Sequence, residues 1–305
     1  MIKKDKAELA VETSREMKRL KAVVDEALAQ HLNHQPEDVP EVLRHAMSYA
    51  VLGGGKRLRP ILTLAACQAL GKQLERALPA GCALELIHAY SLVHDDLPSM
   101  DDDQERRGKP TVHVKFGVPA AILTGDALLS EAFQILSTPT RSLPAELRLK
   151  IVSEVARASG AAGMVGGQQY DMSAADDRPD LDGIARLHAM KTGALFRAAV
   201  VCGGLAGEAN PTELEKLERY GRLVGRAFQV TDDLLDLQES RASEDAETTG
   251  DPHEDAVSLA VQLGEKGSRA EAKRLVSEAC EIANSFGERG WLLEGLARLI
   301  ESRQV

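Results

Sequence analysis

Two clusters of aspartates, each at the end of an apolar run with helical spacing, constrain this chain more than any other feature. The first is Asp95-Asp96-Leu97-Pro98-Ser99-Met100-Asp101, and the second is Asp232-Asp233-Leu234-Leu235-Asp236. Crowded carboxylates repel one another at neutral pH unless a cation lies among them. Mg²⁺ prefers oxygen ligands and also binds phosphate oxygens. The two clusters therefore predict a fold that holds both helix ends around metal ions and a diphosphate.

Apolar residues recur at helical spacing along most of the chain, and no segment alternates convincingly as a strand would. Ala, Leu, Glu and Arg dominate the composition, which favours helices. We predict helices at residues 7–32, 41–52, 60–71, 79–97, 119–137, 144–160, 180–188, 191–207, 211–237, 255–264, 267–286 and 288–303. Because no Ser-, Gly- or Pro-rich linker divides the chain, we expect one all-α domain, residues 1–305, around a buried apolar centre.

The composition argues against several classes of protein. A net charge of −10 disfavours a nucleic-acid partner, which would need a basic face. No uncharged apolar run reaches the ~18–20 residues that span a bilayer, and the charged N-terminus does not resemble a signal peptide. The four cysteines lack the spacing of a zinc site or a disulfide framework. We therefore expect a cytoplasmic protein without membrane insertion.

Helical geometry makes a prediction for the second cluster. Gln229, Asp232 and Asp236 step by three and four residues, so they should share one helix face. Two carboxylates and an amide would then point to the same place. Taken alone, this pattern is also typical of a solvated acidic face.

The first cluster requires a break in its helix. His88 and Asp95 are two helical turns apart and should lie on one stripe, whereas an unbroken helix would turn Asp101 away from Asp95. Pro98 lies between the two aspartates, and the irregularity that it causes could bring Asp101 round. A self-satisfied loop of surface ion pairs is the alternative here.

Three basic elements accompany the acidic clusters. Arg106-Arg107-Gly108-Lys109-Pro110 follows the first cluster, and guanidinium groups suit phosphate oxygens. Gly53-Gly54-Gly55-Lys56-Arg57-Leu58-Arg59-Pro60 joins glycines, which let backbone amides approach an anion, to two cations one turn apart. Lys191-Thr192-Gly193 opens an apolar helix, where a phosphate can bind. In isolation, each element could equally be an ordinary helix start or surface loop.

In this order, the motifs resemble those of the trans-prenyl diphosphate synthases, and the chain is similar to short-chain enzymes of the farnesyl diphosphate synthase type. The resemblance covers nearly the whole chain. The matching stretches are Gly54–Pro60, His88–Asp103, Arg106–Thr111, Gly125–Leu129, Gly166–Gln168, Lys191–Gly193 and Gln229–Asp236. The resemblance implies an isoprenoid synthase bundle around a deep central cavity, usually in a homodimer.

The resemblance also implies a role for each site residue. About three Mg²⁺ ions would hold an allylic diphosphate, and their ligands would be Asp95, Asp101 and Asp232, with Asp96, Asp233 and Asp236 in support. The allylic diphosphate would also contact Arg106. Isopentenyl diphosphate, which needs no metal, would bind Lys56, Arg59, His88 and Arg107. The residues near the allylic carbon, which help to stabilise a carbocation, would be Lys191, Thr192 and Gln229.

Product length, by the same resemblance, depends on the residues just before the first cluster. Bulk there forms a floor under the growing prenyl tail. Tyr90 stands five residues before Asp95, with Ser91 next. An aromatic at this place, with the longer D-D-x-x-x-x-D spacing, marks bacterial enzymes that stop at C15. We expect farnesyl diphosphate, with C20 or C10 products as alternatives.

The segment after the second cluster departs from the family pattern. The family usually carries two lysines there, whereas this chain reads Thr249-Gly250-Asp251-Pro252-His253-Glu254-Asp255-Ala256-Val257-Ser258-Leu259. No lysine occurs from residue 230 to residue 264. A weaker enzyme, a different substrate, or a modulatory subunit with little catalysis would each fit this loss. A class I terpene cyclase is a further alternative, although it needs no isopentenyl diphosphate site. The intact acidic motifs favour an active enzyme.

Overall fold

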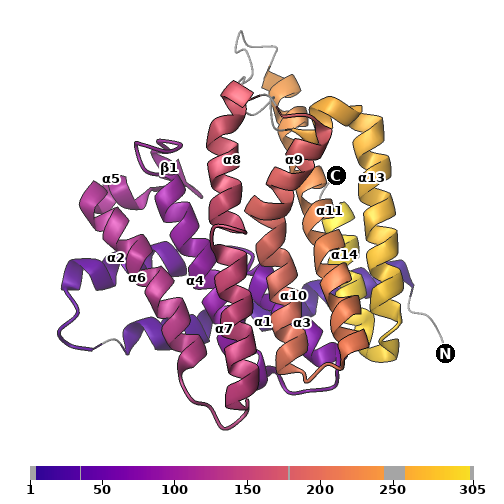
Figure 1. Cartoon of the computed structure of the whole chain (residues 1–305), viewed down its shortest axis with the longest axis horizontal. Helices are drawn as coiled ribbons and strands as arrows, with labels where there is room; N and C mark the ends of the chain where they lie inside the picture. Colours follow the sequence, from indigo (N-terminus) through magenta and orange to yellow (C-terminus); the bar gives the residue numbers. More distant parts are fainter. Residues whose placement is uncertain (1–4, 35, 178, 244–257, 303–305) are drawn as a thin grey trace.

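Helices dominate the computed structural model, which describes residues 5–34, 36–177, 179–243 and 258–302 (Figure 1). The α-helices are α1 (Lys6–Asn33), α2 (Glu41–Leu52), α3 (Leu58–Ala69), α4 (Leu78–Asp95), α5 (Val112–Phe116), α6 (Val118–Ser137), α7 (Ala145–Ser159), α8 (Met164–Asp177), α9 (Leu181–His188), α10 (Ala194–Ala206), α11 (Pro211–Ser243), α13 (Leu259–Asn284) and α14 (Trp291–Ser302). The shorter elements are η1 (Leu74–Arg76), the π-helical turn η2 (Ala189–Gly193), η3 (Gly287–Gly290), β1 (Glu105–Arg106) and β2 (Lys109–Pro110).

The chain marks several helix ends with proline, glycine and capping residues. Pro79 and Pro119 lie in the first turn of α4 and α6, where a missing N–H costs no helical hydrogen bond. Gly117, with φ of 90°, separates α5 from α6. The Asp180 side chain caps α9 and accepts a hydrogen bond from the Gly183 backbone N–H at 2.8 Å.

The most apolar helices form the centre of the bundle. Nearly every residue of α10 is buried, and this helix packs on α3, α7 and α11. Helix α4, also buried over most of its length, packs on α6 and α3. A helix that is apolar on all sides needs neighbours all round, which explains these positions. In Figure 1, α1 crosses behind the upright helices, and it contacts α14. This contact between the first and last helices supports the proposal of one domain.

The helix predictions are confirmed for most elements, with four differences, the first being the short helix α5, which was not predicted. Helix α8 was not predicted, because Gly166 and Gly167 disfavour helices. A Cβ at Gly167 would overlap the backbone of Lys191, so glycine there permits α8 to approach η2. The helices predicted at 255–264 and 267–286 are one helix, α13, with a break at Gly264, and residues 255–257 lie outside the described part. The short β1–β2 hairpin turns through Arg107 and Gly108, both at positive φ.

In the part of the chain that the structure describes, one stretch, Leu181–Ala206, is long and apolar enough by composition to cross a membrane. Its most apolar window is 61% buried inside the bundle, and a buried core helix passes the same test. The stretch contains α9, η2 and α10.

Candidate active site

A cavity of about 710 Å³ lies between α3, α4, α6, α8 and η2. Small-molecule sites typically enclose about 300–1,000 Å³. The predicted site residues that line it come from three separate stretches of sequence, and they are Arg59, His88, Tyr90, Ser91, Asp95, Lys191 and Thr192. We call this space the central cavity.

The turn after α4 brings the two aspartates of the first cluster together. Beyond Pro98 the chain curls back, and the backbone N–H of Asp101 donates to the carbonyl of Asp95 at 2.9 Å. Asp102 follows with a φ of 53° and donates to the Leu97 carbonyl at 3.1 Å. The prediction that a break at Pro98 returns Asp101 to Asp95 is confirmed.

The surroundings of these aspartates suit a cation. Burial raises the pKa of Asp95 to about 6; nearby Lys191 opposes this rise and Asp101 adds to it. Burial likewise raises the pKa of Asp101. Lys191 donates a hydrogen bond to Asp171 of α8, which is buried. A divalent cation would favour the ionised carboxylates, so this donor set fits Mg²⁺. Among the described residues, however, no three His, Cys, Asp or Glu side chains already converge as a metal site.

A cluster of positive charge occupies another part of the central cavity. Burial lowers the pKa of Arg59 to about 10, and its guanidinium lies 5.0 Å from the centre of the Phe196 ring. The buried Nε of Arg59 has no hydrogen-bond partner among the residues that the structure describes. Burial, together with Arg59 and Arg107, lowers the pKa of His88 well below its usual value. A buried donor without an acceptor, beside a neutral imidazole and a second guanidinium, suits an anion.

The glycines before α3 let Arg107 approach this cluster. Arg107 donates from Nη1 to the Gly54 carbonyl at 2.7 Å. Gly55 has a φ of 125°, and a Cβ there would lie 2.8 Å from that Nη1. The backbone conformation therefore requires glycine, and a side chain there would also displace the Arg107 guanidinium. Lys56, also predicted to bind here, is exposed.

Arg57 holds this loop in place, a role that the sequence did not suggest. It adopts a left-handed conformation with φ of 54° and is 4% exposed. Its guanidinium donates to Asp25 and to Glu85, each at 2.7 Å, and to the Val51 carbonyl at 2.6 Å. Arg57 thereby links α1, α2 and α4 to the start of α3, where Arg59 lies.

Asp96 and Arg106 form an ion pair beside the central cavity. Nε of Arg106 donates to Asp96 at 2.6 Å, and the same guanidinium lies 3.0 Å from Asp103. Neither partner is among the residues that line the central cavity. The positive charge of Arg106 nevertheless acts on Asp95, where it partly opposes the rise in pKa that burial causes. Their proposed contacts with metal and diphosphate stay predictions.

The second cluster lies on α11, where Asp233 has two hydrogen-bond partners. Gln229 donates to Asp233 at 2.8 Å, and Asp233 also accepts from the Leu259 backbone N–H at 2.7 Å. The predicted convergence of Gln229 with Asp232 stays a prediction, because residues three apart also share a helix face and the bond to Asp233 does not fix the direction of Asp232. Asp232 acts electrostatically on Arg59, which lines the central cavity. Its partner in the predicted face, Asp236, lies one turn further along α11.

Tyr90 lies against a neighbour that the sequence reading missed. Tyr90 is 6% exposed, and its ring packs edge-on against His94 with 5.9 Å between ring centres. A ring nitrogen of His94 lies 3.1 Å from the Ile122 carbonyl of α6. A Cβ at Gly125 would overlap this imidazole. The glycine in the matching stretch Gly125–Leu129 was the signal that could have identified His94.

Gln168 of α8 was also missed as a site residue. It lines the central cavity, and its buried Nε2 has no hydrogen-bond partner among the described residues. The sequence feature that could have identified Gln168 is the family-matching stretch Gly166–Gln168. The segment where the family lysines are missing cannot be compared in this way, because residues 244–257 lie outside the described part.

Comparison with known proteins identifies the family. Residues 40–287 match the family model described as polyprenyl synthetase, which is most of the chain. The chain belongs to the polyprenyl synthetase family. It is 42% identical over 265 residues to a dimethylallyltranstransferase of Fischerella ambigua, covering 87% of this chain and 77% of that protein. It is 38% identical to the farnesyl diphosphate synthase of Bacillus subtilis, covering 87% and 90%.

A third relative, the geranylgeranyl diphosphate synthase of Cyanophora paradoxa, is 38% identical and covers 93% of this chain and 94% of its own. Among solved structures, an FPP/GFPP synthase from Zymomonas mobilis aligns with a TM-score of 0.85 and 39% identity, over 95% of this chain and 99% of that one. The predicted all-α isoprenoid synthase fold is confirmed, and the chain is a short-chain prenyltransferase. Because the names of these relatives differ in product, they leave open how long a prenyl product this enzyme makes.

Proposed function

We propose that this enzyme condenses isopentenyl diphosphate with dimethylallyl and then geranyl diphosphate to give farnesyl diphosphate. The observation that carries the proposal is the pair of oppositely charged regions in the central cavity. Asp95, which lines the cavity and feels the charge of nearby Asp101, suits a metal-bound diphosphate. Arg59 with His88 suits a second diphosphate without metal. A terpene cyclase binds one diphosphate and would not need the second region.

Metal binding is part of this proposal. Mg²⁺ would be held by the carboxylates of both clusters, namely Asp95, Asp101 and Asp232, with Asp96, Asp233 and Asp236 in support. Its positive charge would stabilise the leaving diphosphate as the allylic C–O bond breaks. We propose that Arg106 adds a guanidinium to the same diphosphate.

The remaining side chains would guide the reaction. Lys191 and Thr192, which line the central cavity, would lie near the allylic carbon and stabilise its positive charge. Gln229, predicted to act with them, lines a separate cavity on the other side of η2, so its place at the allylic carbon stays a prediction. Apolar side chains such as Met164 and Val165 of α8 line the central cavity and would limit water, which would otherwise convert the cation to an alcohol. The isopentenyl double bond then forms the new C–C bond, and the departing diphosphate accepts the proton that is lost.

Product length in this proposal rests on Tyr90. Its buried ring, packed on His94 and backed by α6, would form a floor with Ser91 beside it.

We further propose that the protein is a cytoplasmic homodimer. Exposed apolar side chains on α5 and α6, such as Val114, Val118 and Leu123, offer a face that a second copy could cover.

Steady-state kinetics of an Arg59→Gln variant test the two-region arrangement. We expect the KM for isopentenyl diphosphate to rise by roughly 10–100-fold, because a charge-assisted contact to phosphate is lost. The KM for geranyl diphosphate should stay within about twofold. Arg219→Gln, which changes an exposed arginine on α11, serves as the control. A rise confined to the geranyl diphosphate KM would contradict the assignment.

A further inference from the structure

A second cavity, of about 380 Å³, lies on the other side of η2 from the central cavity. Helices α7, α9, α10 and α11 supply most of its walls. Ala189, Met190 and Gly193 of η2 line it, whereas Lys191 and Thr192 of the same turn line the central cavity. One π-helical turn, a structure common at functional sites, thus separates the two spaces. A ligand in the second cavity would contact the backbone that carries Lys191 and Thr192.

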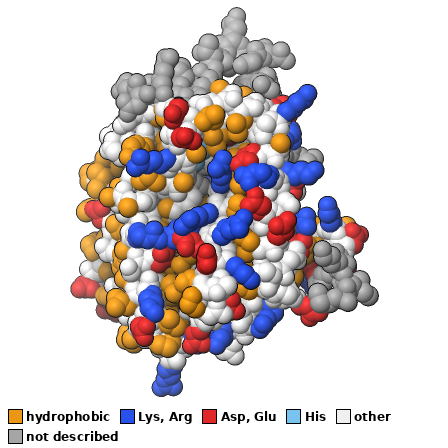
Figure 2. Space-filling model, turned by 45° about the vertical axis from the view of Figure 1, so that its right-hand side comes forward, with side chains coloured by type: hydrophobic (Ala, Val, Ile, Leu, Met, Phe, Trp, Pro, Cys, Tyr) orange, Lys and Arg blue, Asp and Glu red, His pale blue; other side chains and the backbone are white. Residues whose placement is uncertain are grey.

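Arginines surround the second cavity, although the chain as a whole has a net charge of −10. Five of the residues that line it are arginines, namely Arg157, Arg186, Arg197, Arg222 and Arg226. Figure 2 shows a face of the molecule on which Lys and Arg side chains stand among acidic ones across the middle. Guanidinium groups bind phosphate through paired hydrogen bonds, so an anionic ligand suits this lining.

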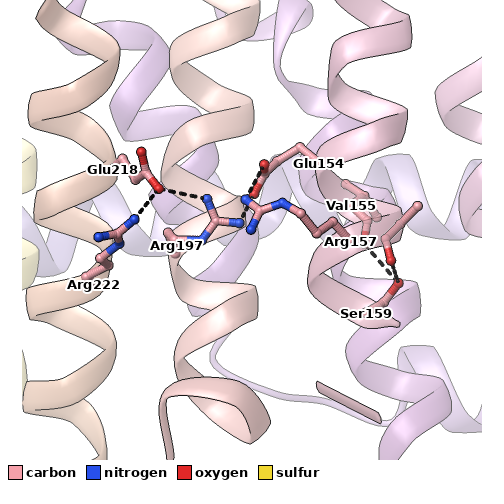
Figure 3. Close-up of polar contacts among 8 residues, drawn as sticks. Glu154, Val155, Arg157, Ser159, Arg197, Glu218 and Arg222 are labelled. Carbon is pink, nitrogen blue, oxygen red and sulfur yellow. Dashed lines mark hydrogen bonds and ion pairs between the residues drawn. The ribbon is translucent and has the colours of Figure 1, made fainter. Parts of the chain in front are cut away.

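Three of these arginines share two carboxylates. Arg197 of α10, 8% exposed, pairs with Glu154 of α7 and lies 3.3 Å from Glu218 of α11 (Figure 3). Glu154 also accepts from Arg157 at 2.8 Å, and Glu218 accepts from Arg222 at 2.6 Å. Because each carboxylate serves two guanidinium groups, one positive charge is left over. Arg157 and Arg222 are each more than half exposed, and both retain N–H donors for a ligand.

Arg186 adds further positive charge. Its guanidinium lies 5.3 Å from the centre of the Tyr170 ring, and it forms no ion pair with a carboxylate in the described part of the chain. The other walls are largely apolar, and they include Ala158, Ala162, Ala185 and Leu259. The lining therefore suits a ligand with an anionic group and an apolar part. The volume of the second cavity is about half that of the central cavity, which would accommodate two prenyl diphosphates in the proposed function.

We propose that the second cavity binds one short prenyl diphosphate as an effector, and that this ligand alters turnover through η2. The proposal rests on the proposed function, since the ligand belongs to the same chemical class as the substrates. The diphosphate would contact the arginines at the rim, and the prenyl chain would lie on the alanines and Leu259. Inorganic diphosphate has the same head-group chemistry but lacks the prenyl chain.

Isothermal titration calorimetry in EDTA tests binding without turnover. The probes are geranyl diphosphate and, separately, inorganic diphosphate. The variant is the double substitution Arg222→Gln and Arg226→Gln, whose side chains are 67% and 49% exposed and so should not be needed for folding. The matched control is Arg219→Gln on the same helix, 66% exposed and outside the second cavity.

We expect wild type and the control to bind geranyl diphosphate at the second cavity, here the further site, since the central cavity would need Mg²⁺ to hold an allylic diphosphate. The double variant should lose the further site or bind there at least about tenfold more weakly. Inorganic diphosphate should bind the further site at least about tenfold more weakly than geranyl diphosphate. Identical stoichiometry and Kd in wild type and double variant would overturn the proposal, and equal affinity for the two probes would overturn the prenyl ligand.

Kinetics with Mg²⁺ separate this proposal from the proposed function. At high geranyl diphosphate, wild type should show a change in kcat of at least about twofold that extra isopentenyl diphosphate does not reverse. The double variant should lose this change while its basal kcat stays within about twofold of wild type. Normal turnover with no further site would overturn the effector alone. A further site in a protein without turnover would overturn the proposed function and leave the site in place.

Discussion

Replacing Asp95 by asparagine should stabilise the metal-free protein while impairing the enzyme. Asp95 is held in a site that disfavours its charge, since burial raises its pKa from 3.8 to about 6. A tenfold change in proton affinity is worth about 1.4 kcal/mol, so the charged form costs about 3 kcal/mol at most. Because Asp95 is partly exposed, we expect about 1–3 kcal/mol in practice.

The sign of this effect depends on pH. A raised folded-state pKa means that the native protein binds more protons than the unfolded chain between about pH 4 and 6. The contribution of Asp95 to stability is therefore full below about pH 4 and is lost as the pH rises through about 6. At pH 8 the Asp95→Asn variant should be more stable than wild type, and the difference should shrink toward pH 4.

Urea unfolding in EDTA at pH 4.5, 6 and 8 measures this difference. A gain of about 1–3 kcal/mol at pH 8 corresponds to a rise in Tm of roughly 2–5 °C for a chain of 305 residues. Asp126→Asn, which changes an exposed carboxylate on α6, should shift stability by no more than about 0.5 kcal/mol. The kcat of Asp95→Asn with Mg²⁺ should fall by roughly 100-fold or more. An Asp95→Asn variant that is less stable than wild type at pH 8, or a difference independent of pH, would refute the reasoning.

Three further substitutions test the packing around the central cavity. Gly167→Ala should force α8 away from η2, lower the free energy of unfolding by about 1–3 kcal/mol and lower kcat. The control, Gly267→Ala in α13, should change the free energy of unfolding by no more than about 1 kcal/mol and kcat by no more than about twofold. Thermal unfolding and turnover assays measure these changes. Tyr90→Ala should remove the floor and shift products toward C20 in mass analysis, and an unchanged C15 product would refute the floor. Arg57→Met should cost about 3–5 kcal/mol in urea unfolding, because it leaves the buried Glu85 unpaired. Adding Glu85→Met should recover part of this loss, and no recovery would show that the ion pair is not the cause.

The positions of the helices could be predicted because their buried faces repeat at helical spacing. The turn that returns Asp101 to Asp95 could also be predicted, since Pro98 leaves the chain no continuous helix. Helix α8 could not, because Gly166 and Gly167 have low helix propensity and are present for close packing on another element. That contact is tertiary and leaves no local periodic signal.

The limits of sequence reasoning in the site have a similar origin. On α11, Asp233 accepts hydrogen bonds from Gln229 and from the Leu259 backbone N–H of α13, and the sequence around the second cluster carries no signal of that contact with α13. Arg57 was not identified because its partners, Asp25 and Glu85, lie 32 and 28 residues away in sequence. The second cavity likewise appears only once four helices have packed together.

Product analysis tests the central claim most directly. Purified protein with Mg²⁺ and isopentenyl diphosphate is incubated separately with dimethylallyl, geranyl or farnesyl diphosphate, and the hydrolysed products are identified by mass. We predict mainly the C15 alcohol from the first two starters and no extension of farnesyl diphosphate. A cyclic hydrocarbon formed without isopentenyl diphosphate, or no turnover with any starter, would contradict the proposed reaction.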